Sequence, residues 1–250
     1  SPPIFSTNWG SDTRYTSSSF NQHILALADH HVSTAPETDK HLIDAGIEKF
    51  SKIYTPIDED KFSNARQEHN ITRGSLPSRK RRNIAFIGRL DEFKDPLTFL
   101  QACLLLNEKE IDFHANIAVN GPLEGKCREF VQSQGLERQV SLLGNIETPE
   151  QLLADSDVFL HISPIENTWA TVIAEAMYVG VPVILTDSGT TRQIFAHEDN
   201  CLLVPPKDPH ALATAIALLL NNESLAESIA EGADRLLIQT GKNQETAGRL

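Results

Sequence analysis

Short apolar segments alternate with helix-like segments throughout residues 83–222, and this alternation limits the fold more than any other feature of the sequence. Strands that alternate with helices of moderate length form βαβ units, which place parallel strands in one sheet. The strand segments are almost wholly apolar, as expected where helices cover both faces of the sheet. We predict strands at 83–88, 113–121, 140–144, 158–163, 181–186 and 201–206, and helices at 96–107, 124–136, 148–156, 169–179 and 208–222.

The first part of the chain carries a shorter version of the same pattern. We predict strands at 3–9, 30–35 and 52–58, and helices at 18–29 and 36–46. Residues 58–82 then lose apolar periodicity and gather charge, glycine and proline, which is typical of a linker. The sequence therefore predicts an α/β protein in two parts, with a small segment and its linker at 1–78 and an open parallel sheet at 79–250.

Charge and cysteine content exclude several classes of protein. The formal net charge of −12 argues against nucleic-acid binding, which requires a basic surface. Three widely spaced cysteines without a CxxC pair favour a reducing compartment and indicate neither a disulfide framework nor a zinc site. No apolar run of bilayer-spanning length occurs, and the first residues do not resemble a signal peptide. The strand-like start of the chain is typical of the interior of a longer protein.

The loop after the strand at 83–88 contains two cations. Arg89 and Lys94 stand five residues apart, directly before a predicted helix. An open parallel sheet binds ligands at the carboxyl ends of its strands. Arginine, lysine and the start of a helix all favour a phosphate group there. The alternative is that both cations pair with nearby acidic residues of the same loop, which are Asp91, Glu92 and Asp95.

The stretch "SPIENTWATVIAEAM" places two carboxylates around the start of another predicted helix. The first N–H groups of this helix, near Ala170, Thr171 and Val172, can bind an anion because they lack intrahelical partners. Glu166 precedes the helix and Glu175 lies inside it, so these carboxylates suit hydroxyl groups beside a phosphate. The alternative is that Glu166 caps the helix and Glu175 pairs with a surface cation.

Two further loops follow predicted strands. Backbone groups around Gly144 to Ile146 suit contact with a flat nucleotide base. The sequence "NWGSD" brings Gly10, Ser11 and Asp12 to the end of the first strand, where they form a polar loop.

Taken in order, these segments resemble the family 4 retaining glycosyltransferases of the GT-B architecture. The segments "FIGRLDEFKDPLTFLQA", "LLGNIETPEQLLADSDVFLHIS", "EAMYVGVPVILTDSG" and "CLLVPPKDPHALATAI" resemble the C-terminal, donor-binding domain of that family. The upstream segments "PIFSTNWGSD" and "HHVSTAPETDKHLIDAG" resemble the last part of its N-terminal domain. The resemblance implies a Rossmann-like C-terminal domain preceded by a partial Rossmann-like N-terminal segment.

The resemblance also implies a role for each candidate residue. Arg89 and Lys94 would hold the donor diphosphate, and Thr171 and Val172 would meet its phosphates. Glu175 would bind the ribose, and Glu166 would contact the donor sugar near the reacting centre. The catalytic set would then be Glu166, Arg89 and Lys94. Gly10, Ser11 and Asp12 would form a loop on the acceptor side.

The sequence departs from the family in the glutamate motif. Eight residues lie between Glu166 and Glu175, one more than the family spacing. If the loop carries an extra residue, Glu166 keeps the first position, and otherwise Asn167 occupies it. Trp169 and Ala170 replace the aromatic–glycine pair of the family, and a Cβ on Ala170 leaves less room for a phosphate.

These expectations combine into a retaining glycosyltransferase that acts in polysaccharide biosynthesis and is a fragment of a longer enzyme. It would transfer a hexose from UDP- or GDP-hexose to a glycan, a lipid or a small acceptor, with no cofactor and no metal. We expect it in the cytoplasm or at the cytoplasmic face of a membrane, with peripheral membrane contact and no nucleic-acid partner. The alternatives are a non-catalytic module that binds a nucleotide sugar and an NDP-sugar epimerase of the same architecture.

Overall fold

A computed structural model describes residues 5–8, 30–33, 39, 42–44, 46–52, 57–74, 82–164, 169–188 and 191–247 of the chain. These residues fall into two compact units. The larger unit comprises residues 57–167 and 171–237, and the smaller one comprises residues 1–56, 168–170 and 238–250.

The larger unit is built around a six-stranded sheet in which every strand is parallel to its neighbours. The strand order is β6-β5-β4-β7-β8-β9, the order of a Rossmann fold, in which the chain reverses direction across the sheet between the first and the fourth strand. This result confirms the predicted α/β class and the parallel sheet. The strands are β4 (Arg82–Ile87), β5 (Phe113–Ala118), β6 (Val140–Gly144), β7 (Val158–His161), β8 (Val183–Thr186) and β9 (Leu202–Val204).

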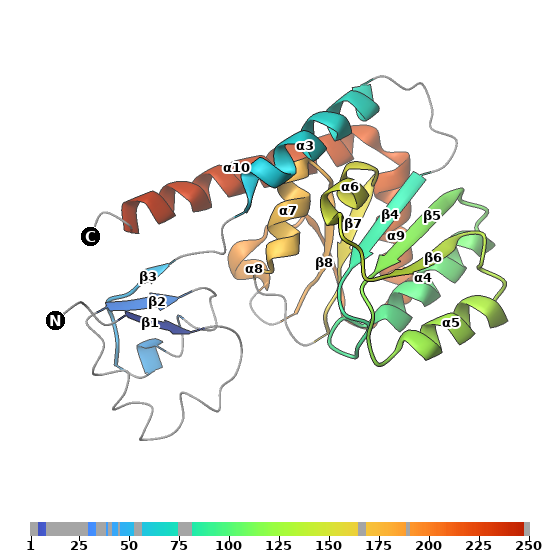
Figure 1. Ribbon diagram of the computed structural model, residues 1–250, viewed down its shortest axis with the longest axis horizontal. Helices are drawn as coiled ribbons and strands as arrows, with labels where there is room; N and C mark the ends of the chain where they lie inside the picture. Colours follow the sequence, from blue (N-terminus) through green and yellow to red (C-terminus); the bar gives the residue numbers. More distant parts are fainter. Residues whose placement is uncertain are drawn as a thin grey trace. The chain divides into compact units, whose positions relative to one another are not determined.

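Helices cover both faces of this sheet (Figure 1). One face carries α4 (Pro96–Glu108), α5 (Glu124–Ser133) and α9 (Pro209–Asn221), and the other carries α3 (Glu59–Gly74), α6 (Pro149–Ala154) and α7 (Thr171–Val179). A short helix, α8 (Thr191–Ile194), precedes β9, and the long α10 (Glu223–Ala247) follows α9. The double covering explains why every residue of β7, β8 and β9 is buried. No helix among the described residues is long and apolar enough to cross a bilayer.

The core beneath α4 is held by aromatic packing between a strand and a helix. Phe86 of β4 and Phe99 of α4 are both buried, and their rings stack with centroids 5.7 Å apart. Burial of such a side chain contributes roughly 1.5–3 kcal/mol. The contact fixes α4, and therefore the loop before it, against the central strand of the sheet.

Helix α3 occupies most of the stretch predicted as a linker, so that prediction is wrong for residues 59–74. Phe62, Ala65 and His69 recur on one face of α3 and are buried, and α3 packs on α6 and α7. Arg66 forms a two-pronged ion pair with Asp234 of α10 at 2.6 and 3.0 Å. The helix was missed because only two of these buried positions are apolar. The domain boundary predicted between residues 78 and 79 lies outside the described residues and stays a prediction.

The smaller unit contains a three-stranded parallel sheet in the order β1-β2-β3. Its strands are β1 (Phe5–Asn8), β2 (His30–Ser33) and β3 (Ser51–Lys52). Strands β1 and β2 lie within predicted strands, whereas β3 overlaps the strand predicted at 52–58 at Lys52 alone. The parallel sheet confirms the partial Rossmann-like segment. The helix predicted at 18–29 lies outside the described residues.

At the carboxyl edge of the large sheet, the loops that follow β4 and β5 lie backbone to backbone. Leu90 donates its amide hydrogen to Asn120 O at 3.3 Å and accepts a hydrogen bond from Leu123 N at 2.8 Å. Gly121 faces this contact, and a Cβ added to it would lie 2.6 Å from the carbonyl carbon of Leu90. Only glycine therefore allows the two loops to approach this closely.

We predict that Gly121→Ala lowers the free energy of unfolding by about 1–3 kcal/mol, because the added methyl group must displace backbone atoms. The matched control is Gly125→Ala in α5, where an added Cβ meets no atom within 4 Å. This control should stabilise the protein by no more than about 1 kcal/mol, since alanine favours a helix over glycine. Urea denaturation measures both variants, and equal stabilities would contradict the prediction.

Candidate functional site

The candidate site lies where the strand order of the large sheet reverses, between β4 and β7. The two strands pair in parallel, with Phe86 opposite Leu160, so their carboxyl ends lie side by side. The chain leaves β4 towards α4 on one face and leaves β7 towards α7 on the other face. Ligands of open α/β sheets bind in the crevice that this divergence creates.

The two predicted cations stand in the loop after β4, as the sequence indicated. Arg89 has a side chain that is 67% exposed, and its Nε lies 3.6 Å from Asp91 Oδ2. Such an exposed ion pair contributes about 0–1 kcal/mol, so an incoming phosphate could replace the carboxylate at small cost. The alternative in which Arg89 pairs with an acidic residue of the same loop is therefore present as a weak ion pair with Asp91.

Lys94 is held differently from Arg89. Its amide donates to Asp91 Oδ1 at 3.1 Å, and its Nζ lies 3.3 Å from Nε2 of His161, the last residue of β7. His161 is buried, and burial together with the positive charge of Lys94 lowers its pKa to about 3. The imidazole is therefore neutral near pH 7 and accepts the hydrogen bond from Lys94.

Hydrogen bonds join the segment after β7 to the end of β8. Ser163 donates its amide hydrogen to Thr186 Oγ1 at 3.0 Å, and Ser188 Oγ donates to Ser163 O at 3.0 Å. Thr191, which is fully buried, places its hydroxyl 2.6 Å from Ser188 O and 3.1 Å from Thr186 O. These bonds fix the point from which the chain enters the loop before α7.

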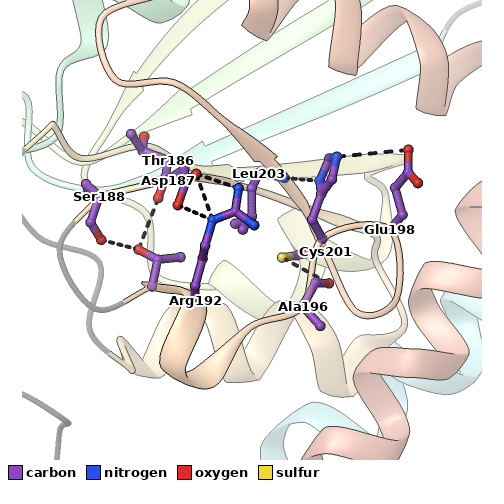
Figure 2. Close-up of polar contacts among 10 residues, drawn as sticks. Thr186, Asp187, Ser188, Arg192, Ala196, Glu198, Cys201 and Leu203 are labelled. Atoms are coloured by element: carbon purple, nitrogen blue, oxygen red, sulfur yellow. Dashed lines mark hydrogen bonds and ion pairs between the residues drawn. The ribbon is translucent and has the colours of Figure 1, made fainter.

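Figure 2 shows how this network continues into α8 and β9. Arg192 of α8 donates hydrogen bonds to Asp187 Oδ2 from Nε at 3.0 Å and from Nη2 at 2.6 Å. His197 accepts a hydrogen bond from Leu203 N of β9 at 2.9 Å. Helix α8 is thus tied to the segment directly after β8, and the segment after α8 is tied to β9.

Helix α7 carries three of the predicted donor-binding residues. Thr171 and Val172 form its first turn, where N–H groups lack intrahelical partners. Glu175 lies one turn later and is half-buried, and burial is the main reason that its pKa is raised. Glu150 also raises this pKa, whereas Lys61 lowers it.

Lys61 and Glu150 form an ion pair beside Glu175. Lys61 Nζ of α3 lies 3.1 Å from Glu150 Oε2 of α6. Because α3, α6 and α7 pack on one another, Glu175 sits in a small charged cluster and not on an isolated surface. The alternative for Glu175 was a pair with a surface cation. Lys61 is such a cation, but it also pairs with Glu150.

The loop after β6 has a backbone conformation that an L-residue rarely adopts. Gly144 ends β6 with φ +68°, and Val119 at the end of β5 has φ +81°. Val119 N donates to Gly144 O at 2.7 Å, and Asn120 N donates to Asn145 Oδ1 at 3.2 Å. These bonds hold Gly144 and Asn145 at the carboxyl edge of the sheet, and contact of Gly144 and Ile146 with a base stays a prediction.

Several predicted residues cannot be placed. Glu166 and Asn167, which compete for the first position of the glutamate motif, lie outside the described residues. The same holds for the predicted acceptor-side residues Gly10, Ser11 and Asp12. Ala170 is described, directly before α7, and belongs to the smaller unit.

Sequence reasoning missed His161, Glu150 and Lys61. A signal was present for His161, because it is the one ionisable residue in the apolar segment "VFLHIS". No local signal marked Lys61, which lay in the supposed linker.

We predict that His161 makes stability depend on pH between its ordinary pKa of 6.5 and its folded pKa of about 3. The unfolded chain binds this proton and the folded chain does not, so stability is complete above pH 6.5 and falls as the pH is lowered. The loss approaches about 1.4 kcal/mol per pH unit.

Urea denaturation at pH 7 and pH 4.5 tests this prediction. His161→Gln should lose less stability over this interval than the wild type. Lys94→Met keeps the aliphatic stem without the charge, and its loss of stability should lie between those of the wild type and His161→Gln. Parallel losses in all three proteins would contradict it.

Comparison with known proteins identifies the family. The family model described as "Glycosyl transferases group 1" matches residues 68–236, which include α4 to α9 and the whole of the large sheet. The match therefore covers well over half of the chain and every described residue of the candidate site except Lys61.

Curated relatives share this part of the sequence. The chain is 32% identical over 199 residues to a D-inositol 3-phosphate glycosyltransferase of Corynebacterium urealyticum, with 76% of this chain and 44% of the relative covered. It is 28% identical over 151 residues to a 2-deoxystreptamine N-acetyl-D-glucosaminyltransferase of Niallia circulans, with 60% and 39% covered. The chain thus spans less than half the length of these relatives.

Solved glycosyltransferases share the fold. The Anabaena protein Alr3699/HepE, solved in complex with UDP, superposes with a TM-score of 0.79 at 19% identity, and the match covers 99% of this chain and 72% of that one. A glycosyltransferase from Rickettsia africae gives a TM-score of 0.76 at 20% identity, with 98% and 70% covered. These likenesses confirm the GT-B type of α/β fold. The chain belongs to the group 1 glycosyl transferases.

Proposed function

We propose that this chain is the donor-binding part of a retaining, family 4 glycosyltransferase that transfers a hexose from a nucleotide-diphosphate sugar. One observation carries the proposal. The loop with Arg89 and Lys94 follows β4, the first turn of α7 follows β7, and these two strands end side by side at the strand-order reversal. Two cations and a helix start around one crevice suit a diphosphate.

The chemistry follows from the charge that develops as the sugar leaves. Cleavage of the bond between the sugar and the diphosphate leaves extra negative charge on the terminal phosphate oxygens. Arg89 and Lys94 would offset this charge, and fixed groups aimed at a developing charge are often the largest single source of rate enhancement. Because the protein supplies these cations, the proposal requires neither a metal ion nor a cofactor.

The remaining residues would bind the other parts of the donor. Glu175 would accept hydrogen bonds from the ribose hydroxyls, and the backbone at Gly144 and Ile146 would contact the base. Glu166 would contact the sugar near the reacting carbon, with Asn167 as the alternative at that position. UDP in the Anabaena relative supports a nucleotide donor, and we propose UDP- or GDP-hexose for this chain.

The acceptor and the location are further parts of the proposal. Names of relatives include glycosyltransferases of colanic acid biosynthesis and of undecaprenol-linked sugars, which supports a glycan or lipid acceptor besides a small one. Gly10, Ser11 and Asp12 would lie on the acceptor side. The three described cysteines are buried free thiols, which suits the cytoplasm or the cytoplasmic face of a membrane.

A non-catalytic module that binds a nucleotide sugar is the second candidate, favoured by the extra residue between Glu166 and Glu175. A module of this kind would bind the donor without breaking it. Incubation of the chain with donor alone, followed by chromatography, separates the two candidates because a working donor site releases some free nucleotide through slow hydrolysis to water.

We predict that the chain binds one nucleoside diphosphate among UDP, GDP and ADP with a clear preference, measured by calorimetry. Arg89→Ala and Lys94→Ala should each weaken this binding by about 10- to 100-fold, the loss expected for a hydrogen bond between charged groups. Both variants should bind the corresponding nucleoside as the wild type does, because the nucleoside lacks phosphate. Glu175→Gln should instead weaken the binding of the diphosphate and the binding of the nucleoside to the same degree.

Two controls sharpen the measurement. Arg128→Ala removes an exposed arginine that pairs with Glu124 within α5, and it should leave binding unchanged. Addition of EDTA should also have no effect if no metal is required. Absence of binding for all three diphosphates, or equal affinity in Arg89→Ala, Lys94→Ala and the wild type, would overturn the assignment of the donor site.

A further inference from the structure

We propose that Lys61 is a positioning residue for the donor nucleoside: while bridged to Glu150, it supplies the counter-charge for the Glu175 carboxylate. The three side chains come from α3, α6 and α7, which pack on one another. The inference rests on the proposed function in one respect, namely that Glu175 accepts hydrogen bonds from the ribose hydroxyls. It adds a residue of α3, a helix that precedes the whole large sheet in the chain, to the recognition of the nucleoside.

Three contacts hold Lys61 in the first turn of α3. Its amide donates a hydrogen bond to Asp58 Oδ1 at 3.2 Å, as in a capped helix start. Its Nζ lies 5.7 Å from the centre of the Phe62 ring, within the range of a cation–π interaction, and Phe62 is buried. The same Nζ lies 3.1 Å from Glu150 Oε2. The ammonium group of Lys61 therefore reaches from α3 to α6.

Glu150 receives this ammonium group in a more protected position. The side chain of Glu150 is 20% exposed, whereas that of Lys61 is 41% exposed. Glu150 lies in the first turn of α6, and α6 packs on both α3 and α7. Salt screens a partly buried ion pair less than a fully exposed one. The pair therefore keeps the Lys61 ammonium beside the helices that surround it.

Glu175 requires a counter-charge because it is half-buried on α7. Burial is the largest cause that raises its pKa, since the carboxylate loses contact with water. Lys61 of α3 lowers this pKa, and Glu150 of α6 raises it. Strand β8, which also packs on α7, contains no charged residue. Among the described residues, burial, one ammonium group and one carboxylate therefore set the charge state of Glu175.

Recognition of a ribose benefits from an ionised Glu175. An ionised carboxylate only accepts hydrogen bonds, and a bond to it is roughly twice as strong as a bond between neutral groups. A protonated carboxyl group would lose this advantage and would carry a donor of its own. Because Lys61 offsets only part of the charge of two carboxylates, the cluster stays negative and attracts the hydrogen atoms of hydroxyl groups.

Two substitutions that break the same ion pair distinguish this role from a structural one. Lys61→Met removes the ammonium group and keeps the aliphatic stem, so it should raise the pKa of Glu175. Glu150→Gln removes the second carboxylate and keeps its shape, so it should lower the pKa of Glu175. If the ion pair were merely structural, both variants would change nucleoside binding in the same direction.

Calorimetry from pH 4.5 to pH 7 measures the effect, with uridine as the probe or the nucleoside of the base that the wild type prefers. A nucleoside is chosen because it has no phosphate group that titrates in this range. Affinity should fall about fivefold as Glu175 becomes protonated, the difference between a charged and a neutral acceptor. Relative to the wild type, the fall should occur at higher pH in Lys61→Met and at lower pH in Glu150→Gln. Identical curves, or shifts in the same direction, would overturn the proposal.

Three controls accompany these curves. Lys61→Arg keeps the positive charge and should restore the curve of the wild type. Glu175→Gln cannot ionise, so it should bind the nucleoside weakly and without dependence on pH over this range. Lys126→Met removes an exposed lysine of α5 and should follow the wild type. A curve for Lys126→Met that matches Lys61→Met would show a general effect of charge and would overturn the role of Lys61.

A measurement without nucleoside keeps this proposal separate from the proposed function. ¹³C NMR of the Glu175 carboxyl group, assigned by its loss in Glu175→Gln, gives the pKa of this group in the free protein. The pKa should be highest in Lys61→Met, intermediate in the wild type and lowest in Glu150→Gln, and any other order would overturn the counter-charge role of Lys61. If this order is found but no nucleoside or nucleoside diphosphate binds, the proposed function is wrong, and so is the role of Lys61 in nucleoside recognition.

Discussion

The parallel pairing of β4 with β7 is the constraint on which the rest of the candidate site depends. Phe86 of β4 and Leu160 of β7 lie opposite each other, so the loops after these two strands begin side by side although a long stretch of chain separates them. The helices that follow pack on opposite faces of the sheet. This divergence brings the loop that holds the cations and the start of α7 to the same edge of the sheet.

The loops at this edge keep their positions through close backbone contacts. Gly121 lets the loop after β5 lie against Leu90 in the loop after β4. Asp95 precedes α4 with φ +45°, a left-handed conformation that short polar side chains tolerate better than most. The backbone of the loop after β4 is thus held at Leu90, between Arg89 and Lys94.

Local charge matters more at this edge than the net charge of the chain. The chain carries a formal charge of −12, yet charges more than about 8 Å apart are largely screened at physiological ionic strength. Binding of a diphosphate therefore depends on the groups next to it. Arg89 is exposed and has a carboxylate partner at 3.6 Å, and the Lys94 ammonium contacts the imidazole of His161. Glu175 lies further along α7, and the nearby carboxylate of Glu150 belongs to α6.

The sequence by itself determined the strands of the large sheet, the helices between them and the loops in which Arg89, Lys94 and Glu175 stand, because each depends on local periodicity and on short motifs. Helix α3 was not predicted because its buried face includes His69, a polar residue that interrupts the apolar periodicity. Only the tertiary structure decided which strands are neighbours, and therefore that His161 meets Lys94 and that Lys61 and Glu150 surround Glu175. Such pairings depend on the order of strands and the packing of helices, and residues so far apart in the chain leave no local pattern that reveals them.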